Sequence, residues 1–122
     1  MTLANLFIGL MVIIVHEAAH LAAAFSLGIQ VKRIGISWKG VYIVREPGPP
    51  VANIITTLAG CSANLFVALA WPGSHQFAVV NLIFGLSNLL PIAGSDGQRA
   101  WIQIAKELPR LTFLRSASQA LR

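Results

Sequence analysis

Two long stretches without charged side chains constrain this sequence more than any other feature. Glu17 is the only charged residue before Lys32, and residues 47–95 contain none. A helix that crosses a lipid bilayer needs about 20 consecutive apolar residues. The second stretch has room for two such helices, because a Pro-Gly turn signal at residues 72–73 divides it. We therefore predict three transmembrane helices, at about residues 2–27, 51–71 and 76–95.

The composition agrees with a membrane protein of one domain. Hydrophobic residues make up 56% of the 122 residues and charged residues only 11%, whereas a soluble domain carries about 25% charged residues. The same balance excludes a disordered chain. The single cysteine, Cys61, excludes an internal disulfide and a zinc site of four thiolates. The length favours a single domain over residues 1–122.

The basic residues give an orientation for the predicted spans. With three spans, the connection at residues 28–50 and the tail at 98–122 lie on the same side of the membrane. All nine Lys and Arg residues fall in these two segments, and the positive-inside rule assigns that side to the cytosol. Because topology explains the net charge of +5, we do not expect nucleic-acid binding. We expect an integral, multi-pass protein of a prokaryotic cell membrane.

A cleaved signal peptide is an alternative explanation of the first stretch. Residues 6–15 resemble its apolar core, and the three alanines at 22–24 resemble a small-residue cleavage site. However, residues 1–5 contain no Lys or Arg, whereas a signal peptide begins with a positively charged segment. We therefore favour a transmembrane helix that is retained.

The connection between the first two spans has the pattern of a β-hairpin. Ile34, Ile36 and Trp38 alternate with smaller or polar residues, and residues 41–44 are rich in β-formers. Lys39-Gly40 is a plausible turn between them. We expect a short hairpin at the cytosolic membrane surface.

The tail at residues 98–122 has the pattern of a basic amphipathic helix. Its apolar residues recur at helical spacing among arginines, which is typical of an interfacial helix. A helix packed on a partner subunit is an alternative. The predicted fold class is therefore an all-α membrane protein with three transmembrane helices, a short cytosolic hairpin after the first, and an interfacial C-terminal helix.

The first predicted span contains three ionisable residues within five positions. His16, Glu17 and His20 form the pattern H-E-x-x-H, and ionisable groups inside a membrane span indicate a functional site. Residues i and i+4 share a helix face, so both imidazoles can bind one metal ion, while Glu17 can take a proton from a water at the metal. Two imidazoles, a carboxylate and an open position suit one Zn²⁺. The alternative is that the three side chains only bond to neighbouring helices.

Asp96 is the candidate third ligand, because it is the only other acidic residue at a predicted membrane position. Pro91 and Gly94 disturb the helix before it, and irregular backbone at membrane depth is found where it is buried in protein or lines a wet cavity. His20 and His16 lie roughly 10 and 17 Å from the cytosolic end of the first span. Since Asp96 follows the cytosolic end of the third span, we expect the site in the cytosolic half of the membrane.

Three motifs follow one another in the chain. The first is H-E-A-A-H at residues 16–20, and the second runs from Gly60 to Asn64. The third runs from Asn88 through Pro91 to Asp96-Gly97, with Arg99 two residues later. In this order they resemble the site-2 protease family of intramembrane zinc metalloproteases, over about residues 7–105. The Gly60 to Asn64 segment is similar to the central Gly-x-x-x-Asn element of that family.

The resemblance implies hydrolysis of a peptide bond in or beside a transmembrane helix of a substrate protein. It implies that His16, His20 and Asp96 are zinc ligands, with one Zn²⁺ per chain. It also implies that Glu17 is the general base, which later donates a proton to the leaving amine.

Two asparagines complete the implied site. The resemblance places Asn64 near the metal, where it would steady the substrate backbone or the developing oxyanion, and Asn88 in the same polar cluster. This sequence departs from the family pattern at Ala93 and Ser95, where relatives usually have proline and leucine. The extra helices and the PDZ or CBS domains of many relatives are not in this sequence. We therefore expect the lipid bilayer, a transmembrane substrate, and a second copy or regulatory membrane protein as partners.

Two other functions fit the same residues. One is a metal-binding membrane protein without proteolytic activity, and the other is an accessory subunit whose polar cluster is only structural. Glu17 favours an enzyme, because metal binding alone does not need that glutamate.

Overall fold

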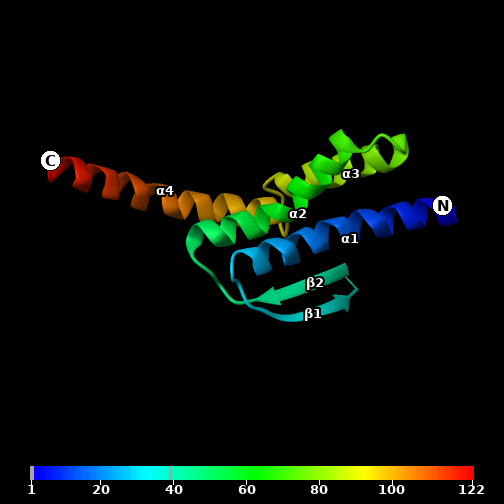
Figure 1. The fold of residues 1–122 in the computed structure, drawn as a ribbon, viewed down its shortest axis with the longest axis horizontal. Helices are drawn as coiled ribbons and strands as arrows, with labels where there is room; N and C mark the ends of the chain where they lie inside the picture. The colour runs from blue at the N-terminus through cyan, green and yellow to red at the C-terminus, as the bar shows by residue number, and fades with distance from the viewer. Residues whose placement is uncertain (1, 39) are drawn as a thin grey trace.

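The computed structural model describes residues 2–38 and 40–122. The described part of the chain contains four helices and one hairpin (Figure 1). The elements in chain order are α1 (Leu3–Ser26), β1 (Val31–Ser37), β2 (Gly40–Arg45), α2 (Pro50–Ala70), α3 (His75–Leu89) and α4 (Asp96–Ala120).

Among the described residues, two helices are long and apolar enough to cross a membrane. They are α1 and α2, with 24 and 21 residues. These are the first two spans predicted from the sequence. A signal sequence or the core helix of a soluble protein can have the same length and composition.

The prediction of a third span at residues 76–95 is wrong. The helix α3 has only 15 residues, or about 22 Å, against a hydrocarbon core of about 30 Å. It ends at Leu89 because Pro91 has no N–H and disfavours helical backbone in the residue before it. Leu90 is accordingly extended, with φ −68° and ψ 148°. Gly94 then adopts a left-handed φ of 82°, and a separate helix, α4, begins at Asp96.

The interior of the bundle is small and polar, and the apolar side chains point outward. The largest fully buried side chains of the described residues are those of Val12, Asn64, Asn81, Thr56 and Cys61. Large apolar side chains along α1 and α2 are exposed instead, as are those of α3. Such a surface is costly in water and suits an apolar environment.

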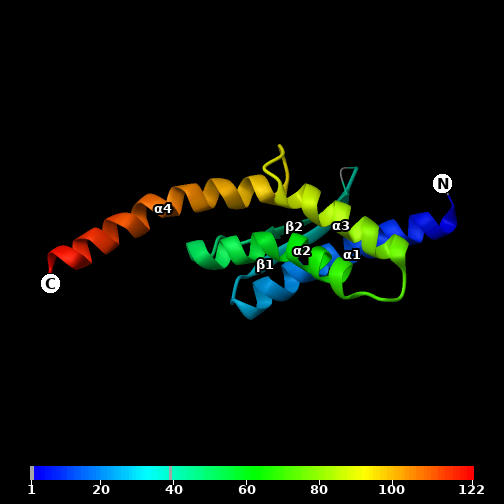
Figure 2. The same cartoon turned by 90° about the horizontal axis from the view of Figure 1, so that it is seen from above.

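The helix α2 is the central element, since it contacts α1, α3 and α4. Its contact with α3 is close at Gly85, where an added Cβ would lie 3.0 Å from Leu65 Cγ and 3.1 Å from the Cys61 carbonyl oxygen. Figure 2 shows α3 beside α2 in the bundle, with α4 extending toward the opposite end of the molecule from the N-terminus.

The predicted hairpin is confirmed. Strands β1 and β2 pair antiparallel, with Ile34 opposite Ile43 and Ile36 opposite Val41. The predicted turn at Lys39-Gly40 includes Lys39, which lies outside the described residues. The hairpin runs back along the C-terminal half of α1 (Figure 1), so that β2 borders the polar centre of the bundle.

The C-terminal helix α4 extends beyond the bundle as a single helix of 25 residues that contains Pro109. Its start is packed, since Ala100 is fully buried. Farther along, Leu108, Leu111, Phe113 and Leu114 are exposed. The interfacial position of this helix stays a prediction.

Candidate metal centre

Three predicted metal ligands from opposite ends of the chain meet in the centre of the bundle. His16 and His20 lie one turn apart on α1, and Asp96 is the first residue of α4. The Oδ2 atom of Asp96 lies 2.9 Å from His16 Nε2 and 3.0 Å from His20 Nε2. The two Nε2 atoms are 3.1 Å apart. The structure therefore brings together His16, His20 and Asp96 as a group that could hold a metal ion.

The other ring nitrogen of each histidine is engaged by an acceptor. His20 Nδ1 lies 2.7 Å from the carbonyl oxygen of Thr56, which can only accept, so this nitrogen carries a proton and donates it. His16 Nδ1 lies 2.8 Å from Asn64 Oδ1. In a neutral imidazole the opposite nitrogen then carries a lone pair, so both Nε2 atoms present lone pairs to the centre.

A chain of amide groups fixes the orientation of Asn64. Its Nδ2 donates to the Val12 carbonyl oxygen at 3.1 Å and to Asn81 Oδ1 at 2.7 Å. Asn81 Nδ2 in turn donates to the Phe77 carbonyl oxygen at 2.9 Å. Because a carbonyl cannot donate, the Nδ2 atom must face Val12, and Asn64 Oδ1 must face His16. The tautomer of His16 therefore follows from the packing of α1, α2 and α3.

The charge at the centre has to be balanced by a cation. Burial alone would raise the pKa of the Asp96 carboxyl, but hydrogen bonds from His16 and His20, which need a proton on an Nε2 atom, outweigh burial and hold that pKa well below its usual range. The group is therefore a carboxylate near neutral pH. A carboxylate between two lone pairs at about 3 Å is repulsive unless a proton on one imidazole or a metal ion lies among them.

The donor set fits a metal ion. Three donor atoms about 3 Å apart can all lie at about 2.0–2.1 Å from one ion, as Zn–N and Zn–O bonds require. Two imidazoles and one carboxylate suit zinc and also other divalent first-row metals. The Nδ1 bonds to Asn64 Oδ1 and the Thr56 carbonyl are of the kind that orients metal-binding histidines.

Two glycines let the backbone approach the site. A Cβ at Gly60 would lie 2.5 Å from His20 Nε2 and 2.6 Å from His16 Cε1, so α2 can pack against the imidazoles only without a side chain there. A Cβ at Gly97 would collide with the carbonyl group of Leu89. The start of α4 therefore packs closely against the end of α3. This close packing places Asp96 near α1.

Ser95 places Asp96 at the start of α4. Ser95 Oγ accepts from the Gln98 N–H at 3.1 Å and donates to the Leu90 carbonyl oxygen at 2.8 Å. It caps α4 and ties it to the end of α3. Ser95, one of the two departures from the family pattern, therefore has a local role in positioning Asp96.

Glu17 and Asn88 face the same cavity as the three candidate ligands. This cavity has a volume of about 440 Å³, and strand β2 and Arg99 also line it. Glu17 is half-buried there. Asn88 Nδ2 donates to the Phe84 carbonyl oxygen at 3.0 Å. Glu17 is thus placed where it can exchange a proton with a water in the cavity.

Asn64 does not line this cavity. It is fully buried behind His16, with its amide bonded to His16, Val12 and Asn81. This position suits a group that orients a ligand rather than one that touches a substrate.

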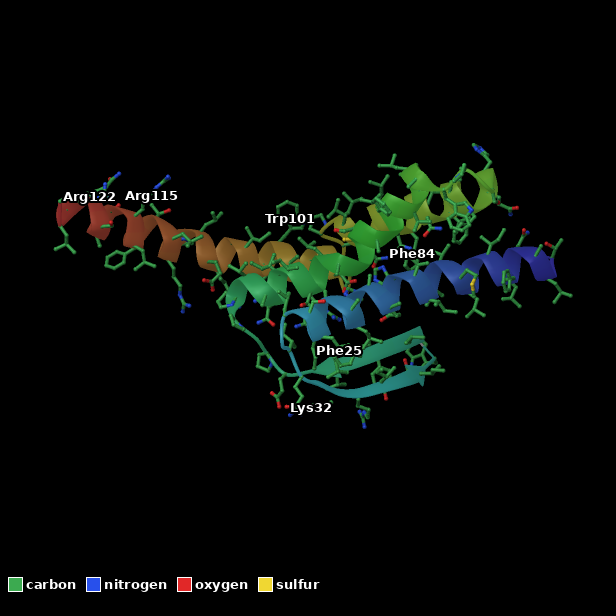
Figure 3. All side chains as sticks on the ribbon, viewed as in Figure 1. Phe25, Lys32, Phe84, Trp101, Arg115 and Arg122 are labelled. Carbon is green, nitrogen blue, oxygen red and sulfur yellow. The ribbon has the colours of Figure 1, made fainter. Side chains whose placement is uncertain are left out.

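The sequence interpretation did not single out several groups at the site. Phe84 packs edge-on against His16, with ring centroids 5.2 Å apart, and Figure 3 shows it near the middle of the bundle. Thr56 contributes a backbone carbonyl, for which a side-chain pattern gives no indication. Asn81 and Arg45 could have been recognised as candidate site residues from the sequence. Asn81 is an amide in an apolar helix and Arg45 is a charged residue close to a predicted span, and both kinds of group need polar partners.

No protein-family model matches this chain, and a search of curated proteins finds no match. The interpretation of the site therefore depends on its own geometry.

Proposed function

We propose that this chain is a metal-dependent intramembrane endopeptidase, similar to the site-2 protease family. One observation carries the proposal. Both imidazoles of the H-E-A-A-H segment donate from Nδ1 and turn Nε2 toward the carboxylate of Asp96. When both imidazoles are neutral, two lone pairs and a carboxylate therefore meet at one point, an arrangement that a bound cation would stabilise.

His16, His20 and Asp96 would hold the ion, with Zn²⁺ as the metal proposed from the ligand types. Zinc bound there would supply an electrophile that polarises the scissile carbonyl and lowers the pKa of water. The Glu17 carboxylate accepts a proton from the attacking water and passes it to the nitrogen of the leaving amine. The water oxygen forms the new C–O bond as the peptide C–N bond breaks. Asn64 holds the His16 ring in place.

Strand β2 supports a substrate in extended form. A peptide bond in a helix is shielded by its own hydrogen bonds, so cleavage needs local unwinding. Strand β2 lines the cavity beside Glu17, and a strand edge can bind an unwound segment by adding a strand to the hairpin. We propose that this edge presents the substrate to the candidate ligands.

The proposed location is a lipid membrane. The apolar exterior of α1 and α2 and the polar interior support it. The basic segments then face the cytosol, as the positive-inside rule requires, and a prokaryotic cell membrane is the proposed compartment. The short helix α3 would reach only part of the way across, with its end near the cavity, and the first turns of α4 would complete the third crossing, so that the tail lies on the cytosolic side.

Cleavage of a synthetic transmembrane peptide tests the proposal. The parent protein and Glu17→Gln are purified in mild detergent, and products are identified by mass spectrometry. We expect cleavage by the parent, a loss of about 10²–10⁴-fold in rate for Glu17→Gln, and the same metal content in both. Cleavage at equal rates by both proteins would contradict the role of Glu17.

The second candidate function is an accessory subunit with a purely structural cluster. The distances of 2.9–3.1 Å among the three groups favour it, because they equal hydrogen-bond lengths. An imidazolium on His16 or His20 would satisfy the Asp96 carboxylate without any metal. This candidate predicts a folded protein that holds no stoichiometric metal ion.

A further inference from the structure

Two arginines line the cavity that contains the candidate metal ligands. Arg45 is the last residue of β2, and Arg99 lies in the first turn of α4. Neither is part of the H-E-A-A-H segment or of the proposed proton transfer.

Arg45 is half-buried and bonded to neutral partners. Its Nη1 donates to Asn53 Oδ1 at 3.0 Å and its Nη2 to Thr57 Oγ1 at 2.9 Å. Within residues 2–38 and 40–122, no carboxylate lies within ion-pair distance of this guanidinium. A cation that is partly removed from water is stabilised by an anion beside it, and the guanidinium has further N–H donors in its planar fork.

Arg99 adds a second positive charge at the same cavity. Its Nη1 lies 4.0 Å from Asp96 Oδ1, and its side chain is 71% exposed. Burial, and then the charge of Arg99, lower the pKa of the Arg45 guanidinium, which agrees with two cations close to one another. Two carboxylates of the described residues line the same cavity, those of Glu17 and Asp96, and the Oδ2 atom of Asp96 is shared by two imidazoles. Among the described residues, neither carboxylate lies within ion-pair distance of Arg45, so its guanidinium can bind a further anion.

We propose that Arg45 and Arg99 form a carboxylate-binding subsite, which holds an acidic side chain of the substrate segment. This inference rests on the proposed endopeptidase function. Guanidinium groups bind carboxylates through parallel N–H···O bonds, and Asn53 and Thr57 hold the Arg45 fork in a fixed orientation. The subsite makes substrates with an acidic residue near the cleaved bond the preferred class.

A peptide fits the subsite better than a lipid headgroup. Arg45 ends the strand that lines the cavity, so a segment lying along β2 would bring one side chain to Arg45 while its backbone reaches Glu17 and the candidate ligands. A lipid headgroup would need only a cation at the membrane surface, such as the exposed arginines farther along α4.

Binding of paired synthetic peptides tests the proposal. The probes are fluorescent leucine-alanine transmembrane peptides with one Glu at successive positions, each matched by a peptide with Gln there. Affinities are measured by fluorescence anisotropy in neutral detergent. We expect the parent protein to bind some Glu peptides at least about tenfold more tightly than their Gln partners. Arg45→Gln should remove this preference and Arg99→Gln should reduce it.

The matched control is Arg115→Gln. It removes the same charge from the far part of α4, away from the hairpin and the bundle (Figure 3), and should leave the preference unchanged. Because Arg45 also ties β2 to α2, the exposed Arg99 provides the variant that does not disturb folding. Metal content, measured on every preparation, verifies that the site is assembled.

Three outcomes would overturn the proposal. They are equal binding of all Glu and Gln pairs by the parent, a Glu preference that survives in both arginine variants, and displacement by phosphatidylglycerol without any Glu preference. The last would assign the arginines to a lipid headgroup. If the protein binds metal and cleaves peptides without this preference, only the subsite proposal is contradicted. If the protein prefers Glu peptides but neither binds metal nor cleaves peptides, only the proposed endopeptidase function is contradicted.

Discussion

The Nδ1 atom of His16 lies 2.8 Å from the Oδ1 atom of Asn64, and both side chains are buried. The residues are 48 positions apart, so the bond exists only where α1 and α2 pack together. It holds a proton on Nδ1 and aims the Nε2 lone pair at Asp96. The site thus depends on a residue that does not touch the cavity.

Replacing Asn64 by Ala should weaken metal binding by about 10–100-fold, because partners that orient a ligating histidine have effects of this size. Competition with a chromophoric chelator in detergent measures the affinity. Asn88→Ala is the matched control, since Asn88 lines the cavity but bonds only to the Phe84 carbonyl. An unchanged affinity in Asn64→Ala would contradict the role of Asn64.

Gly60→Ala should disrupt the site, because its Cβ would overlap the two imidazoles. We expect loss of stoichiometric metal and a fall in unfolding free energy of about 1–3 kcal/mol, typical of overpacking. Metal analysis and thermal unfolding measure these effects. Gly9→Ala, within α1, is the control, since a Cβ at Gly9 meets nothing within 4 Å. Equal behaviour of the two variants would show that α2 does not approach the histidines so closely.

Metal affinity should fall as the pH decreases. The Asp96 pKa lies below its usual range, so this ligand stays ionised and adds no pH dependence near neutrality. Imidazoles bind metal only when neutral, and free imidazole titrates near pH 6.5. Affinity should therefore be nearly constant above about pH 7.5 and decrease below about pH 6. Chelator competition across this range measures it, and equal affinity at both ends would exclude histidine ligands.

Proline in the hairpin should reduce cleavage while metal stays bound. Ile36 and Val41 face each other across the strand pair, and proline removes an N–H from the ladder. Ile36→Pro and Val41→Pro should lower the cleavage rate about tenfold or more if substrates bind to the hairpin as an added strand. Ile36→Val is the control with an intact backbone. Full activity in both proline variants would contradict substrate binding at this edge.

Local patterns predicted α1, α2 and the hairpin, because apolar length and β alternation act over neighbouring residues. The prediction of a third span was wrong, also for a local reason. Pro91 was recognised as a helix breaker, but the break at Leu90 and the left-handed Gly94 end α3 and start a new helix. Hydropathy alone does not distinguish one interrupted span from two helices.

The candidate site was predictable in part. The spacing of His16 and His20 on one helix places both imidazoles on the same face, whatever the rest of the fold. The position of Asp96 depends on the capping of α4 by Ser95 and on close packing at Gly97, and it was inferred from resemblance and elimination. The contact of Asn64 with Asn81, and that of Arg45 with Thr57, depend on packing between elements, which no periodicity in one segment encodes.

Metal content tests the central claim most directly. The parent protein, His20→Ala and Asp96→Asn are purified in mild detergent without chelators, and zinc and other divalent metals are measured by inductively coupled plasma mass spectrometry. We expect about one zinc ion per chain in the parent, as a single three-ligand site requires, and clearly less in both variants. A well-folded parent that binds no metal, even after addition of zinc, would contradict the account and favour a cluster held by a proton.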